Sequence, residues 1–334
     1  MRGFYTLDSK HYLFAAKEIR FFMNYFSHNP LNRYADLRPD AAYMDQLWKH
    51  KKARVLVVNN NLNLLLPTQD EAAILSAVEA EALADHAQVR VYLGSEGKVP
   101  YFALGFSELS PVLVPEPYTF HDLRQTALHL PKEQSALLAY ARGIVHWNIC
   151  HAFCPDCGGP THSTYAGHVR QCSHEACQKQ HFPRTDTAVI VLISEGDACL
   201  LGRQQVWQPG MYAVIAGFLE PGETLEQAVA REAMEETGVS LRSITYHSSQ
   251  PWPFPSSIMV GFRAVAANRY IKVDNQELED ARWFTRAQIK SGLEQGTLRM
   301  PPQFSISYRL ISDWFNEAGE YTLDEIVAAS ALKV

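Results

Sequence analysis

Residues 217–239 of this 334-residue chain read GFLEPGETLEQAVAREAMEETGV. Gly217 permits a tight backbone turn at the start of this stretch. Thr224, followed by Gln227 three residues later, predicts a helix N-terminus closed by a capping box. Gly238 stands where a helix commonly ends in the left-handed conformation. The stretch therefore predicts a turn, a helix and a second turn.

Three carboxylates stand close together on this predicted helix. Glu232, Glu235 and Glu236 occupy positions i, i+3 and i+4, which share one helix face. Like charges at this spacing repel, and a divalent cation such as Mg²⁺ or Mn²⁺ would reverse the sign of that effect. Taken alone, the spacing favours a solvated acidic face. The flanking glycines and Arg231 shift the interpretation toward a cation site.

The segment resembles the Nudix box, G-x5-E-x7-R-E-U-x-E-E-x-G-U, where U is a bulky aliphatic residue. The matching positions are Gly217, Glu223, Arg231, Glu232, Glu235, Glu236, Gly238 and Val239. Ala233 is a soft departure, because a bulkier aliphatic residue is common there. The resemblance implies an α/β/α sandwich in which glutamates hold the cations that bind a diphosphate.

The same resemblance implies a role for individual residues. Glu232 and Glu236 would be direct metal ligands, and Glu235 would be a ligand or the general base. Arg231 would orient the carboxylates by ion pairing. The carbonyl of Ala216, just before the box, would also face the metal.

A second motif, SQPWPFPSS at residues 249–257, follows the box. Its alternating prolines exclude a helix and an ordinary central strand, and they predict a stiff extended loop. Trp252 and Phe254 on such a loop would offer stacking surfaces to a planar base. A rigid hydrophobic loop packed on the core is the alternative interpretation.

This motif resembles the S-Q-P-W-P-F-P-x-S signature of the NADH pyrophosphatase branch of Nudix enzymes. The resemblance implies that the segment lines the nucleotide site. The implied lining residues are Gln250, Pro251, Trp252, Pro253, Phe254, Pro255, Ser256 and Ser257. The likeness extends over most of residues 20–315.

Further site residues follow from this resemblance one by one. Phe218 would stack on the adenine, and a backbone group of Ser307 would contact the substrate. Phe182 occupies a position often held by a substrate-contacting Tyr, so the hydroxyl is missing here. Arg124 aligns loosely with a substrate-binding arginine.

One metal ligand is implied outside the box. Glu277 would be that ligand, although Glu279 and Asp280 are close enough in sequence to compete for the role. Hydrolysis would split the diphosphate linkage of NADH or NAD⁺ into nicotinamide mononucleotide and AMP. Removal of NAD caps from RNA by the same chemistry, a broader nucleoside-diphosphate hydrolase, and a zinc-ribbon regulator with an inactive Nudix domain are the alternatives.

Four of the six cysteines have the spacing of a zinc ribbon. They are arranged as Cys154-x2-Cys157 and Cys172-x4-Cys177, which reads as a metal site in a reducing compartment. The second pair is wider than usual, so His174 is an alternative ligand. Since four sulfurs leave no open position, a structural Zn²⁺ is expected. Four other histidines are expected in solvated loops: His151, His162, His168 and His181.

The rest of the chain predicts an α/β (α+β) protein. Strands are expected at residues 54–58, 89–93, 101–104 and 187–193, the last buried on both faces because it is continuously apolar. A helix is expected over residues 71–86, and a helical segment over 121–149 starts again near Pro131. Pro111, Pro115 and Pro117 suggest a boundary.

The predicted domains follow the motifs. They are an N-terminal mixed α/β domain at 1–118, a connecting helical segment at 119–150, a zinc ribbon at 151–183 and a C-terminal Nudix α/β/α sandwich at 184–320. The family resemblance also implies a homodimer.

The net charge and the hydrophobic pattern of the chain limit the kinds of binding partner that are expected. The formal charge of −6 argues against nucleic-acid binding driven by net charge, although it leaves room for a local basic groove. No apolar run reaches the ~18–20 residues of a membrane helix, and the first residues lack a secretory h-region. A cytoplasmic enzyme is therefore expected.

Overall fold

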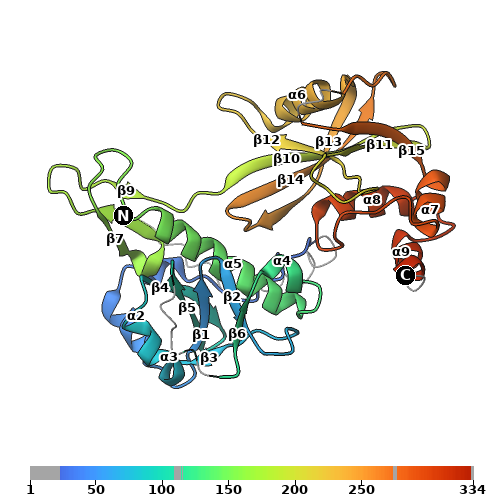
Figure 1. The fold of residues 1–334 in the computed structure, drawn as a ribbon. Helices are drawn as coiled ribbons and strands as arrows, with labels where there is room; N and C mark the ends of the chain where they lie inside the picture. The colour runs from blue at the N-terminus through green and yellow to red at the C-terminus, as the bar shows by residue number, and fades with distance from the viewer. Residues whose placement is uncertain (1–22, 109–113, 115, 274–276, 332–334) are drawn as a thin grey trace, which may run out of the picture.

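The computed structural model describes residues 23–108, 114, 116–273 and 277–331. Residues 1–22 of the first predicted domain, and Pro111 and Pro115 of the predicted boundary, lie outside the described residues. Three sheets are present in this part of the chain, and they follow one another along the sequence (Figure 1). The mixed α/β class is confirmed.

The N-terminal sheet has the strand order β4-β5-β1-β2-β6, with β3 paired to β1. Its strands are β1 Arg54–Asn59, β2 Leu62–Leu65, β3 Leu75–Ser76, β4 Val89–Glu96, β5 Val99–Phe106 and β6 Thr119–His121. The three strands predicted in this half are confirmed. Asn60 and Asn61 both have positive φ, which suits the tight hairpin between β1 and β2.

Helices cover both faces of this sheet. They are η2 Ala35–Leu37, α2 Ala41–Trp48, α3 Ala77–Ala84, α4 Leu123–Thr126 and α5 Lys132–Cys150. Pro131 precedes α5, as the sequence predicted. The long helix α5 lies between the N-terminal sheet and the C-terminal part of the chain (Figure 1).

The helix predicted over residues 71–86 is shorter than expected. It begins only after Ser76, whose side chain accepts from Glu79 N while the Glu79 carboxylate accepts from Ser76 N. Leu75 and Ser76 instead pair with β1. The Ala- and Glu-rich composition continues upstream, but the pairing and the capping box place the helix start at Ala77.

A small three-stranded sheet follows α5. It consists of β7 Thr161–Thr164, β8 Val169–Cys172 and β9 Gln180–His181 in the order β7-β8-β9, with η3 Tyr165–Gly167 in the hairpin. Gly167 lies so close to Val91 of β4 that an added Cβ would meet Val91 at 2.7–2.9 Å. This module therefore packs directly on the N-terminal sheet.

The C-terminal sheet has the order β13-β14-β10-β11-β15, with β12 paired to β10. The strands are β10 Asp186–Glu195, β11 Ala198–Arg203, β12 Ile215–Phe218, β13 Leu241–Trp252, β14 Ser257–Ala266 and β15 Asp280–Thr285. Six consecutive residues of β10 are buried, which confirms the strand predicted to be covered on both faces. Only β10 and β14 run parallel among these pairs of the described chain.

Four helices sandwich the C-terminal sheet. Helix α6 Leu225–Thr237 packs on one face, and α7 Arg286–Glu294, α8 Ile306–Asn316 and α9 Leu323–Ala331 cover the other (Figure 1). The predicted capping box at Thr224 and Gln227 and the left-handed Gly238 are present at the ends of α6. None of the helices described is long and apolar enough to cross a bilayer.

The proline-rich motif departs from the predicted loop. Strand β13 continues through Pro251 and Trp252, which pair with Ile258 and Ser257 of β14. Because β13 is the edge strand of its sheet, Pro251 can join it without leaving a ladder partner unsatisfied.

Candidate functional site

Three glutamates converge beside β12. Glu232 and Glu236 on α6 meet Glu277, and their carboxylate oxygens lie within 4.8 Å of one another. Glu232 and Glu236 are only 7% and 6% exposed. Burial, with the charges of Glu232 and Glu277, raises the pKa of Glu236 to about 8. Burial likewise raises the pKa of Glu232.

This cluster suits a hard divalent cation. Buried carboxylates that repel one another are costly without a compensating charge, and Mg²⁺ and Mn²⁺ prefer oxygen ligands. Glu279 and Asp280, the sequence neighbours of Glu277, are not members of the cluster. Glu279 pairs instead with Arg203, and Asp280 with Arg282.

Gly217 lets Glu232 reach the end of the sheet. A Cβ at position 217 would lie 1.9–2.3 Å from the three terminal carboxyl atoms of Glu232. Real contacts of that kind do not occur, so any side chain at 217 would displace this carboxylate. Gly217 lies within strand β12 and not in the tight turn that the sequence predicted, so the glycine is needed here for space.

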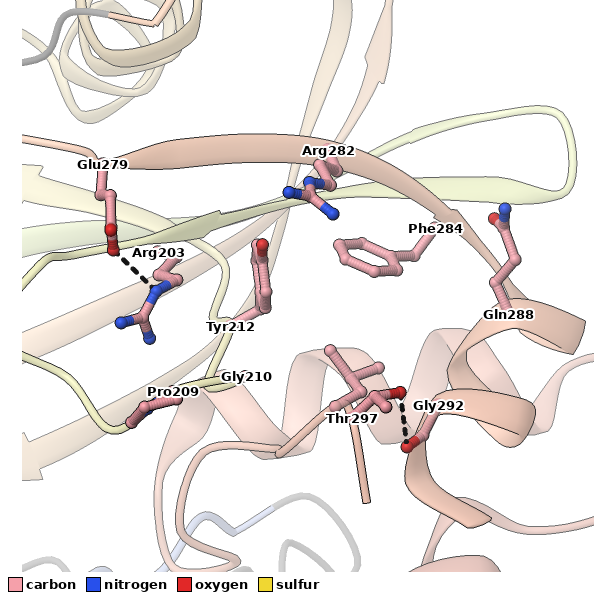
Figure 2. Close-up of a pocket in the computed structure, with 11 residues that line it drawn as sticks. Arg203, Pro209, Gly210, Tyr212, Glu279, Arg282, Phe284, Gln288, Gly292 and Thr297 are labelled. Carbon is pink, nitrogen blue, oxygen red and sulfur yellow. Dashed lines mark hydrogen bonds and ion pairs between the residues drawn. The ribbon is translucent and has the colours of Figure 1, made fainter. Parts of the chain in front are cut away.

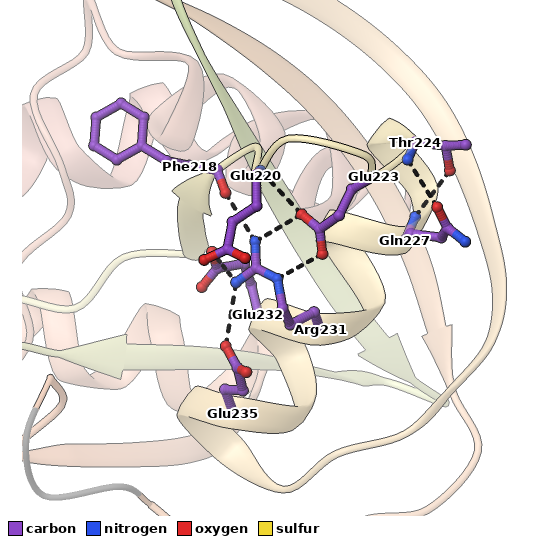
Figure 3. A network of polar contacts seen from close by, with 8 residues as sticks. All are labelled: Phe218, Glu220, Glu223, Thr224, Gln227, Arg231, Glu232 and Glu235. Carbon is purple, nitrogen blue, oxygen red and sulfur yellow. Dashed lines mark hydrogen bonds and ion pairs between the residues drawn. The ribbon is translucent and has the colours of Figure 1, made fainter.

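Arg231 ties the loop and helix together (Figure 3). Its Nε and Nη2 donate to both oxygens of Glu223 at 2.7 and 3.0 Å, and Nη1 donates to Glu232 at 2.8 Å. The same Nη1 donates to Glu235 at 3.1 Å, and Nη2 donates to the carbonyl of Phe218 at 2.8 Å. These charge-assisted bonds hold Glu232 and the backbone of Phe218 in place, which is the orienting geometry expected of this arginine.

Glu235 does not join the carboxylate cluster, contrary to the single face expected from spacing. Its side chain is 61% exposed and points to Arg231. With 3.6 residues per turn, positions i+3 and i+4 diverge to opposite sides of position i, about 100° apart. Glu236 thus turns into the sheet beside Glu232, and Glu235 turns toward solvent.

Phe218 ends β12 and is 60% exposed, and its ring points away from Arg231 and the glutamates in Figure 3. Ala216, two residues earlier, lies half-buried in β12 opposite Ile190. Ser307 is buried in the first turn of α8, where its hydroxyl accepts a long bond from Val214 N at 3.4 Å. Phe182 is exposed just after β9. Both exposed rings are thus available to a ligand.

The proline-rich segment is largely an internal joint, which corrects the expectation of exposed stacking surfaces. Phe254 is only 8% exposed and belongs to the same core as α5 and the N-terminal sheet. Trp252 is partly buried and stacks on Phe304, with ring centroids 5.9 Å apart. These two rings therefore fit the alternative interpretation, in which the segment is rigid, hydrophobic and packed on the core.

Gln250 serves the same joint. It is fully buried, and its Nε2 donates to the carbonyls of Tyr25 and Phe304 at 3.1 and 2.7 Å. Its Oε1 accepts from Ile306 N at 2.7 Å. Asn24 adds bonds to Ser248 Oγ and Ser249 O on the same strand. Both ends of the Gln250 amide are therefore satisfied by the protein.

The remaining residues of the segment form its turn and its return strand. Pro253 and Pro255 lie in the turn between β13 and β14, and Ser256 Oγ donates to Asp186 at 3.2 Å. Ser257 begins β14.

Two arginines hold this turn against the N-terminal half. Arg124 lies over the Phe254 ring at 4.6 Å, and Arg142 lies on the same ring at 4.8 Å. Arg142, buried on α5, also donates to Pro253 O at 2.8 Å and pairs with Asp122. Sequence reasoning missed Arg142, although a charged residue within the apolar stretch of α5 was the available signal.

The four predicted cysteines come together at the third sheet. All four sulfurs lie within 4.8 Å of one another, with Cys154 and Cys177 3.8 Å apart and Cys157 and Cys172 3.4 Å apart. Such separations and an all-sulfur donor set fit tetrahedral Zn²⁺. The structure thus confirms that the four predicted cysteines cluster. His174 is not among the clustered ligands of the described chain.

Two nearby histidines are not the solvated loop residues that were expected. His181 Nε2 lies 3.2 Å from Cys154 Sγ, close enough to hydrogen-bond this sulfur. His168 bonds the carbonyl of Tyr92 at 2.9 Å, and burial lowers its pKa to about 4. His168 therefore joins the cysteine module to β4 as a neutral ring.

Two family models match the chain. The NUDIX domain matches residues 183–304, and the NADH pyrophosphatase-like rudimentary NUDIX domain matches residues 52–147.

Curated relatives match as well. The "NAD-capped RNA hydrolase NUDT12" of Macaca fascicularis is 40% identical over 66% of this chain and 51% of its own length. The "NAD(P)H pyrophosphatase NUDT13, mitochondrial" of Homo sapiens is 34% identical over 59% of each chain. The "NAD-capped RNA hydrolase" of Schizosaccharomyces pombe is 31% identical over 87% of this chain and 94% of its own. The chain spans about half the length of the first of these relatives.

Proposed function

This chain belongs to the NADH pyrophosphatase family of Nudix hydrolases, and we propose that it hydrolyses the diphosphate linkage of NAD(H). The products would be nicotinamide mononucleotide, oxidised or reduced, and AMP. The observation that carries the proposal is the cluster of the buried Glu232 and Glu236 with the exposed Glu277, at a strand end where Gly217 leaves room for Glu232.

The chain's own residues divide the work. Glu232, Glu236 and Glu277 would hold Mg²⁺ or Mn²⁺ together with the carbonyl of Ala216. A bound divalent cation supplies charge neutralisation at the diphosphate oxygens and acidifies a coordinated water. Glu235, which is exposed and pairs with Arg231 outside the cluster, is proposed to accept the proton of the attacking water.

Substrate positioning falls to the exposed rings and nearby polar groups. Phe218 would stack on the adenine beside the scissile diphosphate, and Phe182 would offer a second surface without the hydroxyl of a tyrosine. Ser307 is proposed to contact the substrate through its backbone. The segment Gln250–Ser257 and Arg124 would shape the nucleotide site from the joint they form, since their side chains are largely engaged with protein.

The zinc site and the assembly complete the proposal. Cys154, Cys157, Cys172 and Cys177 would hold a structural Zn²⁺, which implies a reducing compartment and supports the cytoplasm. The four domains are proposed at 1–118, 119–150, 151–183 and 184–320, and the protein is proposed to be a homodimer. Light scattering coupled to size exclusion tests the last point, because a monomeric mass would contradict it.

The decisive experiment compares substrates on one preparation. Hydrolysis of NADH, NAD⁺ and an NAD-capped oligoribonucleotide is measured with added Mg²⁺ or Mn²⁺. Glu236→Gln removes one charge from the cluster and is expected to lower turnover by orders of magnitude with the fold intact. Glu226→Gln, an exposed residue of the same helix, is the matched control. Wild-type turnover by Glu236→Gln at saturating cation would exclude the assignment.

NAD-capped RNA is the second candidate substrate, because two of the relatives above bear the name NAD-capped RNA hydrolase. The bond broken is the same, so the ratio of kcat/KM for capped RNA and for NADH separates the two. A chain that hydrolyses none of these substrates would favour a zinc-ribbon regulator with an inactive Nudix domain.

A further inference from the structure

A second hollow lies on the face of the C-terminal sheet opposite α6. It opens between the edge strand β15, helix α7 and the loop that leads to β12, and its volume is about 580 Å³ (Figure 2). Its main lining side chains are Arg203, Tyr212, Glu279, Arg282, Phe284 and Gln288. This volume lies within the range of pockets that hold small molecules.

The hollow has an aromatic wall. Tyr212 and Phe284 pack edge to face with ring centroids 5.0 Å apart, and both rings line the space. Tyr212 is held by a hydrogen bond from its hydroxyl to Asp280. A rigid aromatic surface of this kind suits a planar base, because stacking then orders few side chains.

Hydrogen-bond donors that have no acceptor among the described residues face the same space. Arg282 uses Nε to pair with Asp280, and no bond to its two Nη groups is found among the described residues. Gln288 accepts from Thr285 N through Oε1, and in the same part of the chain its Nε2 has no acceptor. A charged fork and an amide donor together favour a ligand with an anionic oxygen, such as a phosphate.

The acidic residues of the hollow are already compensated. Glu279 accepts from Arg203 Nε at 2.8 Å, and Arg203 also donates to the carbonyls of Trp207 and Gln208. Arg203 is therefore fully occupied with protein, whereas Arg282, with 64% of its side chain exposed, is not. The donors that lack an acceptor in the described part of the chain, the Nη groups of Arg282 and Nε2 of Gln288, lie on the β15 and α7 side of the hollow.

The hollow lies close to the metal cluster along the chain. Glu277 belongs to the carboxylate cluster and Glu279 lines the hollow, so only Leu278 stands between them, and their Cα atoms are at most about 7 Å apart. We propose that this hollow binds a nucleoside monophosphate unit, with its base against Tyr212 and Phe284 and its phosphate on Arg282. The proposal rests on the proposed function and adds a second nucleotide site to it.

Two sources could supply this unit. It is either a free mononucleotide, such as the AMP product, or the nucleotide that follows the cap in an NAD-capped RNA. Isothermal titration calorimetry with AMP, in the absence of divalent cations, measures binding to the hollow and does not require hydrolysis. Steady-state kinetics on NADH and on an NAD-capped oligoribonucleotide then distinguish the two sources.

Arg282→Ala is the test variant, Arg282→Gln is a second variant that keeps the side-chain stem, and Arg242→Ala is the control. Arg242 is an equally exposed arginine on β13 that pairs with Glu195. Loss of a charge-assisted contact is expected to weaken AMP binding about ten-fold in both Arg282 variants.

The kinetic result assigns the source. If kcat/KM falls about ten-fold on the capped oligonucleotide and stays unchanged on NADH, the hollow takes the nucleotide after the cap. If only AMP binding falls, the hollow takes the free mononucleotide. If the Arg282 variants match Arg242→Ala in both measurements, or if wild-type protein binds no AMP in the titration, the proposal is wrong. Failure of the proposed function would appear separately, as absent hydrolysis by the wild type.

Discussion

Gly217→Ala is expected to damage catalysis far more than folding. The backbone of Gly217 is that of strand β12, which alanine adopts readily. The new Cβ would lie 1.9 Å from the nearest carboxyl atom of Glu232, although real contacts essentially never fall below 3.0 Å. The carboxylate must therefore move by on the order of 1 Å, which a flexible side chain can do with little effect on stability.

The functional cost follows from that displacement. Glu232 is a proposed metal ligand, and Arg231 holds it in place at 2.8 Å. A misplacement of ~1 Å in a catalytic site can lower the rate about 100-fold, which equals about 2.8 kcal/mol at 1.4 kcal/mol per decade. We expect kcat/KM for NADH to fall by this factor, and the Mn²⁺ concentration for half-maximal rate to rise.

The assay pairs kinetics with thermal denaturation. Gly143→Ala is the matched control, because its Cβ would meet only Pro253 Cβ, at an ordinary 3.8 Å. Both variants should melt within a few degrees of the wild type. If Gly217→Ala keeps wild-type kcat/KM and Mn²⁺ dependence, then Glu232 does not act from the position seen here. A large fall in Tm would instead show that the glycine serves the fold.

Three further predictions concern the divalent cation at the carboxylate cluster, the zinc at the cysteines, and the adenine base of the substrate. Burial raises the pKa of Glu236 from 4.5 to about 8, so the cation-free folded chain holds this proton more tightly than the unfolded chain, and its stability should fall as pH rises from 4.5 through 8. Added Mg²⁺ should therefore raise Tm more at pH 8 than at pH 5, and an equal or opposite trend would contradict the burial argument. Cys154→Ser should release zinc and lower Tm, whereas Cys150→Ser should keep both; elemental analysis that finds no zinc in the wild type would end this assignment. Phe218→Ala should lower kcat/KM for NADH by roughly one to two decades, because stacking is worth ~1–3 kcal/mol per base; an equal loss on a diphosphate without a base would mean that the ring only supports the loop.

Local signals predicted local structure well. The capping box at Thr224 and the left-handed Gly238 define α6 because both act within a few residues of the helix ends. The apolar run of β10 predicted burial on both faces for the same reason. Cysteine spacing predicted the cluster, since a metal site with two short knuckles constrains the spacing directly.

Contacts across long stretches of sequence were beyond such reasoning. Gln250 bonds the carbonyl of Tyr25, 225 residues away, and Phe254 packs in the core of the N-terminal half. The sequence alone does not distinguish an aromatic residue that packs in the core from one that binds a ligand. The proline-rich segment was therefore expected to expose rings that the structure covers. Glu277 entered the site only through the family resemblance, because nothing in its own neighbourhood separates it from Glu279.

The joint at Trp252 and Phe254 has a consequence for dissecting the protein. A fragment that starts at Pro183 keeps the whole C-terminal sheet but loses α5 and Phe26, which cover these rings. It would present Trp252, Phe254 and Phe304 to water as one apolar patch, a recognised cause of self-association. The SQPWPFPSS segment thus belongs to a C-terminal half whose apolar surface is covered by the N-terminal half. A minimal catalytic fragment would need polar replacements for these rings to remain in solution.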